Sequence, residues 1–199
     1  MGTNHMGRQS IRFPQPPVVR GFASVAGKKE REGPLGDQFT ATVQDTTFGE
    51  KSWERAERRM QQMTLELALE KAGLTDADLD AAFAGDLLNQ CIGSSFSLRN
   101  RGVPTLGLYG ACSTMAESLL LAAMSVSGGY ARTALAMTSS HFASSERQYR
   151  FPLGYGGQRT PTSQWTVTGA GAVLLGGGER GIRITAATIG SIVDRGICG

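Results

Sequence analysis

Short apolar runs alternate with helix-forming stretches along most of this sequence, and that alternation constrains the fold more than any other feature. Alternating strands and helices are typical of layered α/β proteins with a mainly parallel sheet. Up to residue 175 the predicted order is β-α-β-α-β-α-β-β, and one more strand closes a final antiparallel hairpin. The expected strands are 18–25, 81–84, 104–109, 133–137, 167–175 and 182–189, and the expected helices are 53–72, 94–100 and 110–126.

The clearest helix is predicted to follow Ser52, whose hydroxyl is a favourable N-cap. Apolar residues recur after it at helical spacing, which predicts one buried face. These residues are Trp53, Ala56, Met60, Met63 and Leu67. Gly73 stands in the position where glycine usually ends a helix.

Three other segments give specific expectations. Polar residues and a proline-rich end predict that residues 1–17 form a flexible N-terminal tail. Residues 104–109 show no polar alternation, which predicts a strand covered on both faces. The polar stretch 139–164 is predicted to be a long loop, and loops of that length in compact domains are often functional.

Charge and cysteine content exclude several classes of protein. A net charge of +3, with scattered basic residues and 7% aromatics, does not indicate a nucleic-acid-binding surface. The cysteines form no metal-binding spacing and there are only 2 histidines, so we expect no metal and no cofactor. No run approaches the roughly 20 apolar residues that cross a bilayer. The first ten residues also lack a signal-peptide core. We therefore expect a cytoplasmic protein that could still contact a membrane-bound partner.

Cys112 has the most informative local context. An expected strand leads into Gly110 and Ala111, and an expected helix begins at or just after the cysteine. Unpaired N–H groups at a helix N-terminus favour an anion, so Cys112 is a candidate nucleophile or anion-site residue. The other interpretation is a small buried hydrophobe, since free cysteine is often fully buried.

Gly110-Ala111-Cys112-Ser113-Thr114 resembles the nucleophile elbow of thiolase-fold enzymes, which include ketoacyl synthases. Further segments together resemble the stage V sporulation protein AD family, and the resemblance covers about residues 21–197. These segments are 33–36, 51–54, 85–90, 138–141, 146–152 and 155–158. The resemblance implies a thiolase-like fold, of which residues 18–199 would form the N-terminal half.

The same resemblance implies a role in endospore formation. Family members help move dipicolinic acid, as its calcium chelate, into the developing spore, and are thought to bind the ligand without transforming it. Full members are roughly twice as long, so we expect a chain that stops before its second half. A lone half would expose a face that normally packs against its twin, which favours homodimerisation or poor solubility. The resemblance also implies contacts with membrane proteins of the same uptake complex, at the spore inner membrane.

Dipicolinate carries two carboxylates on a flat ring, so its site needs donors at both ends. The helix N-terminus at Cys112 can supply one end. Arg147 and Arg150 could hold the other carboxylate through a bidentate contact. Solvated surface arginines are the alternative interpretation of this pair.

Three further residues are candidate ligand contacts. His141 follows an expected strand, where it could contact the ligand or be a satisfied core histidine, and we favour the ligand contact. Asp86 also ends a strand and could orient His141, although capping the next segment is the simpler role. Gln158 is a weaker candidate on the long loop.

Three functions remain open at this point. The first is non-enzymatic binding of dipicolinate, and the second is a thiolase-like acyl transfer with Cys112 as nucleophile. The third is a structural docking subunit of a spore membrane complex. Thiolase-fold enzymes activate the thiol with residues from their second half, such as a His-Asn pair. This chain has no such half, so we expect no catalytic residue in it.

Overall fold

The fold is built around one six-stranded sheet. The computed structural model describes residues 4–149 and 166–196. The strand order is β4-β3-β8-β7-β5-β6. The strands are β3 (Val18–Ala26), β4 (Ala41–Thr42), β5 (Ala81–Gly85), β6 (Thr105–Leu108), β7 (Thr133–Ser140) and β8 (Gly169–Gly176).

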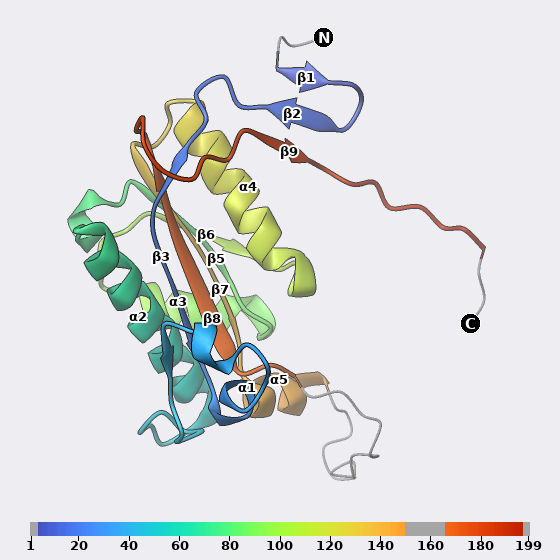
Figure 1. Ribbon diagram of the computed structural model, residues 1–199. Helices are drawn as coiled ribbons and strands as arrows, with labels where there is room; N and C mark the ends of the chain where they lie inside the picture. The colour runs from blue at the N-terminus through green and yellow to red at the C-terminus, as the bar shows by residue number, and fades with distance from the viewer. Residues whose placement is uncertain (1–3, 150–165, 197–199) are drawn as a thin grey trace.

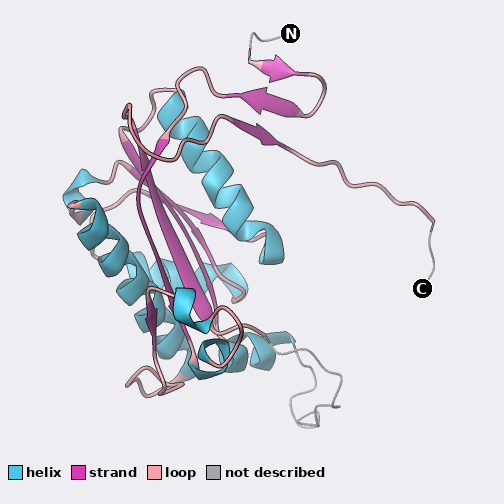
Figure 2. Cartoon of the chain, in the orientation of Figure 1, coloured by secondary structure: helices cyan, strands magenta, loops and turns pink. Residues whose placement is uncertain are grey.

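Helices cover both faces of this sheet. The helices are α1 (Lys28–Arg31), α2 (Trp53–Ala72), α3 (Ile92–Leu98), α4 (Thr114–Ser127) and α5 (Phe142–Tyr149). In Figures 1 and 2, α2 and α3 lie on one face and α4 lies on the other. The predicted layered α/β architecture is therefore confirmed.

Strand direction explains where a site can form. β5 pairs in parallel with both β6 and β7, whereas β8 runs antiparallel between β3 and β7. The sheet is thus mixed and mainly parallel, as predicted. The carboxyl ends of β5, β6 and β7 consequently meet at one edge, the usual place for ligand binding in such sheets.

Helix α2 begins and ends where the sequence predicts. The Ser52 hydroxyl accepts the Arg55 N–H at 3.3 Å, and Gly73 adopts a left-handed φ of 64° after the last turn. The buried face differs from the prediction, because Met63 and Leu67 are only half-buried. The side chains that pack inward are Ala56, Glu57, Met60, Gln61, Thr64, Leu65, Ala68 and Leu69. Three of these are polar, and they become important at the site.

Separate apolar cores lie on the two faces of the sheet. Leu65 and Leu69 of α2 pack with strand residues such as Leu135 on one side. Ala122 and Ala123 of α4 pack with Leu175 and its neighbours on the other. Each fully buried leucine stabilises the fold by about 1.5–3 kcal/mol, so these cores fix both helix layers on the sheet.

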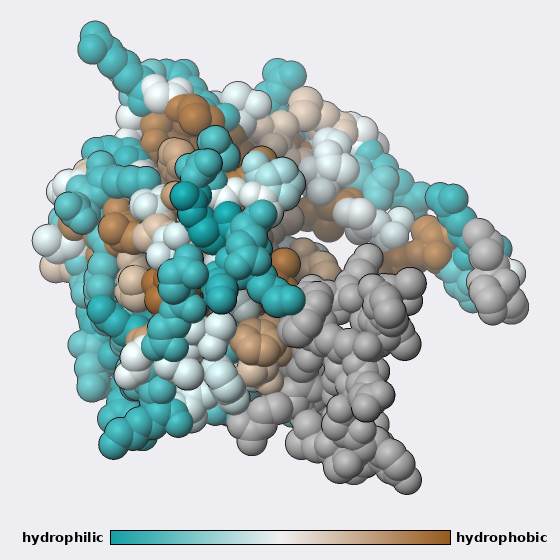
Figure 3. Space-filling model, turned by 60° about the horizontal axis from the view of Figure 1, so that its bottom comes forward, coloured by the Kyte–Doolittle hydropathy of each residue, from teal (hydrophilic) through white to brown (hydrophobic). Residues whose placement is uncertain are grey.

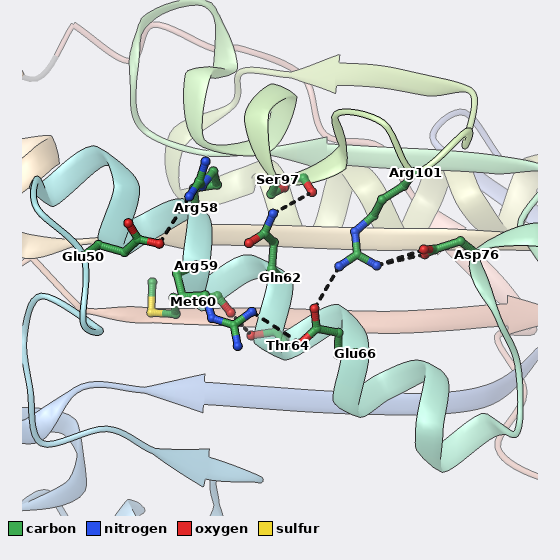
Figure 4. A network of polar contacts seen from close by, with 10 residues as sticks. All are labelled: Glu50, Arg58, Arg59, Met60, Gln62, Thr64, Glu66, Asp76, Ser97 and Arg101. Carbon is green, nitrogen blue, oxygen red and sulfur yellow. Dashed lines mark hydrogen bonds and ion pairs between the residues drawn. The ribbon is translucent and has the colours of Figure 1, made fainter.

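Ion pairs attach the outer side of α2 to the segments around it (Figure 4). Arg101 contacts Glu66 and Asp76 at 3.0 Å each, and Arg58 contacts Glu50 at 3.2 Å. Partly exposed pairs of this kind contribute only about 0–1 kcal/mol each.

Strand β6 is not covered on both faces, and that prediction was wrong. It is the outermost strand of the sheet, next to β5. Thr105, Leu106 and Gly107 are exposed, and only Leu108 is buried. A short apolar run marks a strand, but the run alone cannot distinguish an edge strand from a central one.

The predicted hairpin of residues 167–175 and 182–189 does not form, because β8 already has β3 and β7 as its two neighbours. Instead β9 (Ala186–Thr188) pairs with β2 (Ser10–Arg12). With β1 (His5–Met6) they make a separate three-stranded sheet.

The N-terminal segment is consequently not a flexible tail throughout, which corrects a second expectation. Ser10–Arg12 is a paired strand, and Phe13 is only 4% exposed. Phe13 belongs to the core on the α4 side of the main sheet, and Ile11 packs against that core. These two apolar residues are two positions apart and give the segment a buried face. The nearby prolines had favoured the prediction of a flexible tail.

The expected loop 139–164 contains structure in its first part. β7 continues to Ser140, and α5 occupies Phe142–Tyr149. Residues 150–164 lie outside the described part of the chain. Within the described residues, no helix is long and apolar enough to cross a membrane.

Candidate functional site

The residues predicted from strand ends do reach the same edge of the sheet. Asp86 follows β5, the turn with Cys112 follows β6, and His141 follows β7. This edge lies at the lower end of Figure 1, and Figure 3 turns that end forward, where the part not drawn in grey is mainly hydrophilic. The three side chains, however, do not form one cluster. Cys112 lies on the α4 side of the sheet, whereas Asp86 and His141 lie on the α2 side.

Cys112 lies on the α4 side in a tight turn. The turn is a 3₁₀ segment, Ala111–Ser113, and α4 begins directly after it, as predicted. The Ser113 hydroxyl donates to the Gly110 carbonyl at 2.8 Å and makes no capping bond to α4. The Cys112 side chain is exposed, so its interpretation as a small buried hydrophobe is wrong.

The turn before Cys112 is conformationally demanding. Ala111 has a φ of 49°, a left-handed conformation that residues with a side chain rarely adopt. A Cβ atom on Gly110 would lie 2.4 Å from Ser113 Oγ and 2.7 Å from Glu117 Oε2. A larger residue at position 110 would displace the Ser113 and Glu117 side chains, and the Glu117 carboxylate lies beside the backbone that leads to the thiol. Strained turns of this kind concentrate at functional sites.

A groove adjoins this turn. Its volume is about 970 Å³, and it runs between α4 and residues 184–192. Leu120, Ile184 and Ile192 contribute to its apolar walls, and its polar lining residues are Ser113, Glu117, Thr188 and Ser191. A slot with apolar walls and a few polar groups is the usual design of a small-ligand site.

His141 lies on the other side of the sheet and is fully buried. Nε2–H donates to the Thr46 carbonyl at 2.8 Å, and Nδ1 accepts the Ala143 N–H at 3.2 Å. The ring packs against Trp53 and Phe142. Burial lowers the pKa of His141, so the ring is neutral at pH 7. Both ring nitrogens are engaged inside the protein, and the imidazole caps the start of α5.

Asp86 is also buried, with 1% of its surface exposed. Oδ1 accepts the Leu88 N–H at 2.9 Å. Oδ2 accepts both the N–H and the hydroxyl of Ser94 at 2.7 Å. The carboxylate therefore orders the start of α3, which is the capping role weighed from the sequence.

A polar cluster on α2 escaped the sequence analysis. Glu57 is fully buried, and its oxygens accept hydroxyl hydrogens from Ser139 at 2.7 Å and Ser144 at 2.6 Å. Burial raises the pKa of Glu57 to about 7. Gln61, one turn later, donates to Ser139 at 2.6 Å. The detectable signal was two polar residues four positions apart beside the apolar stripe of α2.

The remaining predicted contacts are only partly located. Arg147 is on α5, and its side chain lies outside the described structure. Arg150 and Gln158 also lie outside the described residues. In the parts of the chain that are described, no three His, Cys, Asp or Glu side chains form a group that could hold a metal ion.

Comparison with known protein families gives a specific match. The family model of stage V sporulation protein AD (SpoVAD) matches residues 7–199. The stage V sporulation protein AD of Bacillus subtilis (strain 168) is 44% identical over 191 residues. That alignment covers 96% of this chain and 56% of the relative, so the chain spans little more than half of the relative's length.

Solved structures share the fold at low sequence identity. The priming β-ketosynthase of the R1128 polyketide pathway gives a TM-score of 0.54 at 18% identity, covering 89% of this chain and 53% of its own. For 3-oxoacyl-[acyl-carrier-protein] synthase III of Aquifex aeolicus VF5 the values are 0.54 and 17%, with 82% and 55% covered. For an OleA variant of Xanthomonas campestris they are 0.55 and 16%, with 83% and 59% covered. These likenesses confirm the thiolase-like fold predicted from the sequence.

Proposed function

We propose, because the chain belongs to the stage V sporulation protein AD family, that it contributes to non-enzymatic binding of dipicolinic acid for uptake into the developing spore. The observation that carries this proposal is the exposed Cys112 turn at the start of α4, next to a groove of about 970 Å³. The end of β3 opens onto a smaller cavity of about 300 Å³, whose lining includes Lys28, Glu30 and Phe142.

The chemistry of this region suits one end of a flat aromatic dicarboxylate. The positive end of the α4 dipole favours a carboxylate at this turn, although the Ser113 and Thr114 N–H groups already donate to the Gly110 and Ala111 carbonyls. The apolar walls formed by residues such as Leu120 and Ile184 suit the ring. The second carboxylate would be held by Arg147 on α5 and by Arg150.

Glu117 affects which form of the ligand binds. Its carboxylate lies beside Gly110 and adds negative charge near the proposed carboxylate position. A bare dianion is repelled there, whereas its calcium chelate carries compensating charge. We therefore propose that the chelate is the preferred species.

Calorimetry tests this function with the full chain, titrated with dipicolinate in the presence and in the absence of calcium. We expect saturable binding that is tighter with calcium and that weakens in Cys112→Ala and Arg147→Ala. Arg147→Ala removes a charged hydrogen-bond donor to the ligand, so we expect the Kd of this variant to rise on the order of tenfold or more.

The matched control is Arg132→Ala, which also removes one positive charge. Arg132 pairs with Asp80 before β7, at the opposite edge of the sheet from Cys112. It should bind like the unmodified protein. Absence of saturable heat with either ligand form, or equal weakening by Arg132→Ala and Arg147→Ala, would refute the proposal.

Acyl transfer is the second candidate, and the exposed thiol before a helix in a synthase-like fold is what favours it. A thiol nucleophile needs a base or another activating group nearby. His141 cannot serve, because both of its ring nitrogens are occupied in the core on the far side of the sheet. A mass increase on Cys112 after incubation with acyl-coenzyme A, lost in Cys112→Ser, would favour transfer over binding.

Docking to membrane proteins of the spore is the third candidate. The extended segment after β9 (Figure 1) carries the exposed apolar residues Ile189, Ile192 and Val193. The same surface is where we propose that homodimers would form. Capture of membrane subunits with unchanged affinity after Cys112→Ala would favour docking over ligand binding.

A further inference from the structure

A cavity of about 350 Å³ lies where the N-terminal hairpin meets the C-terminal end of α4, and we call it the hairpin cavity. The hairpin is formed by β1 and β2, which lie near that end of α4 in Figure 1. Cys112 precedes the opposite end of the helix. A helix of 14 residues is about 21 Å long, so the hairpin cavity is separate from the Cys112 turn.

Ser127, in the last turn of α4, lines the hairpin cavity and has an unusual environment. Its Oγ is buried and has no hydrogen-bond partner in the described structure. A helical serine commonly donates to a carbonyl of the preceding turn, as Ser118 does to Met115 at 2.9 Å. Buried hydroxyls are almost always paired. An unpaired one that lines a cavity is therefore available to a bound ligand.

The other polar side chains of the hairpin cavity can also donate hydrogen bonds. They belong to Asn4, His5 and Arg12, and none of the described lining residues is acidic. The hairpin holds these side chains together, because the Arg12 N–H donates to the Asn4 carbonyl at 2.8 Å and His5 pairs with Ile11. Within the described residues, no acid forms an ion pair with Arg12. Donors of this kind around one cavity favour a ligand with an oxyanion.

The remaining walls of the hairpin cavity are apolar. Phe13 is 4% exposed and belongs to the core on the α4 side, so it provides a fixed wall. Met124 is 42% exposed, and its flexible side chain can adapt to the shape of a ligand. Cavities for small organic ligands combine apolar walls with a few polar groups, and their volumes are roughly 300–1,000 Å³. The hairpin cavity therefore suits a small organic anion better than an inorganic one.

The C-terminal end of α4 is the negative end of the helix dipole, which opposes an anion. This effect is confined to the last turn and is weaker than a charge-assisted hydrogen bond from a guanidinium. The last carbonyls are also occupied, since the Met124 carbonyl accepts the Gly128 N–H at 2.8 Å. The Ser125 carbonyl accepts the Tyr130 N–H at 2.9 Å. Arg12 consequently outweighs the dipole, and the cavity favours a negative ligand.

We propose that the hairpin cavity binds a small organic carboxylate about the size of benzoate. Arg12 holds the carboxylate, and the apolar part of the ligand contacts Phe13 and Met124. The Ser127 hydroxyl donates to the carboxylate after rotation to another staggered rotamer, which requires no backbone movement. The bound ligand thereby connects the hairpin to α4. This site is independent of the dipicolinate site proposed beside Cys112.

Calorimetry of the full chain with benzoate, at pH 7 and constant ionic strength, tests the hairpin cavity. We expect saturable binding. Arg12→Gln removes the positive charge and should raise the Kd on the order of tenfold or more. Ser127→Ala should raise it about fivefold, and this variant should fold normally because the hydroxyl has no protein partner to lose.

Two variants serve as matched controls. Arg8→Gln also removes one positive charge from the hairpin, but Arg8 lies in its turn and is not among the described residues that line the cavity. Cys112→Ala alters the other proposed site. Both should bind benzoate like the unmodified protein. Equal weakening by Arg8→Gln and Arg12→Gln would refute the site, and loss of benzoate binding in Cys112→Ala would assign the ligand to the groove instead.

Two further probes test the chemistry of the ligand. Benzamide has the ring without the charge, and inorganic phosphate has the charge without the ring. Each should bind at least tenfold more weakly than benzoate, because each lacks one of the two kinds of contact. Benzoate should also increase the hydrogen-exchange protection of the Arg12 amide, which joins the two strands of the hairpin. The proposal fails if benzoate gives no saturable heat, if either probe binds as tightly, or if protection of the hairpin does not change.

Discussion

Residues that follow the strand ends are buried on one side of the sheet and exposed on the other. On the α2 side, Asp86 and His141 are buried and every polar atom described for them has a protein partner. On the α4 side, Cys112 is exposed at a strained turn beside an open groove. Position along the strand brings all three residues to one edge. The side of the sheet then decides whether a residue supports the fold or is accessible to a ligand.

If the α2 side is structural, removal of its central acceptor should have the largest effect. Asp86→Ala leaves the Leu88 N–H and both donors of Ser94 without an acceptor. Each stranded buried donor costs about 1–3 kcal/mol, so we expect a loss of about 4 kcal/mol in the free energy of unfolding. Urea denaturation at pH 7 measures this.

A surface acid provides the control for that comparison. Asp76 pairs with Arg101 in a partly exposed site, and Asp76→Ala should cost less than about 1 kcal/mol. If the two alanine variants lose similar stability, the buried acid on the α2 side stabilises the fold no more than a surface acid does.

The second prediction concerns the pH dependence of stability from Glu57. Its pKa is about 7 in the folded protein and 4.5 in the reference state, so the folded state binds more protons between these values. Stability from this group is fully present below pH 4.5 and is lost as pH rises to 7, by about 3 kcal/mol. His141 acts in the opposite direction, because its lowered pKa reduces stability as pH falls.

The difference between two proteins isolates the Glu57 contribution. Urea denaturation of the unmodified protein and of Glu57→Gln, at several values between pH 5 and 8, cancels the effect of His141. The unmodified protein should lose stability relative to Glu57→Gln as pH rises. A constant difference across this range would contradict an uncompensated acid on the α2 side.

The sequence predicted features that depend on local pattern. Ser52 and Gly73 marked the ends of α2, and the strand before Cys112 and the helix after it were both placed correctly. Turn and cap residues act within a few positions of the chain, so their effect can be recognised without knowledge of the fold. The family motifs around Cys112 also indicated the thiolase-like fold correctly.

Features that depend on partners far along the chain were missed. The exposure of β6 follows from its place at the sheet edge, and the pairing of β9 with β2 joins residues nearly 180 positions apart. The burial of His141 depends on Thr46 and Trp53, neither of which is near it in sequence. The burial of Glu57 likewise depends on Ser139 and Ser144, which lie 82 and 87 positions further along the chain.

A third variant, with a smaller expected effect, tests whether stability on the α2 side depends more on buried polar contacts than on the ends of α2. Ser52 caps α2 at the surface through one hydrogen bond of 3.3 Å to the Arg55 N–H. Ser52→Ala should reduce the free energy of unfolding by about 1 kcal/mol, the usual cost of a lost N-cap. Thermal denaturation followed by circular dichroism is sufficient to measure it. A loss as large as that of Asp86→Ala would place the critical polar contact at the helix end, outside the core.

The smallest effect is expected on the α4 side, at Cys112. Its side chain is exposed, so Cys112→Ala removes little buried surface and should change the free energy of unfolding by less than about 0.5 kcal/mol. Cys91→Ala is the matched control, because Cys91 is buried and its Sγ donates to the Leu108 carbonyl at 3.2 Å. That variant should lose about 1–2 kcal/mol through the lost packing and the unpaired carbonyl. If Cys112→Ala proves as destabilising as Cys91→Ala, the thiol contributes to the fold. The strained turn would then need a structural explanation, and the contrast between the two sides of the sheet would no longer hold.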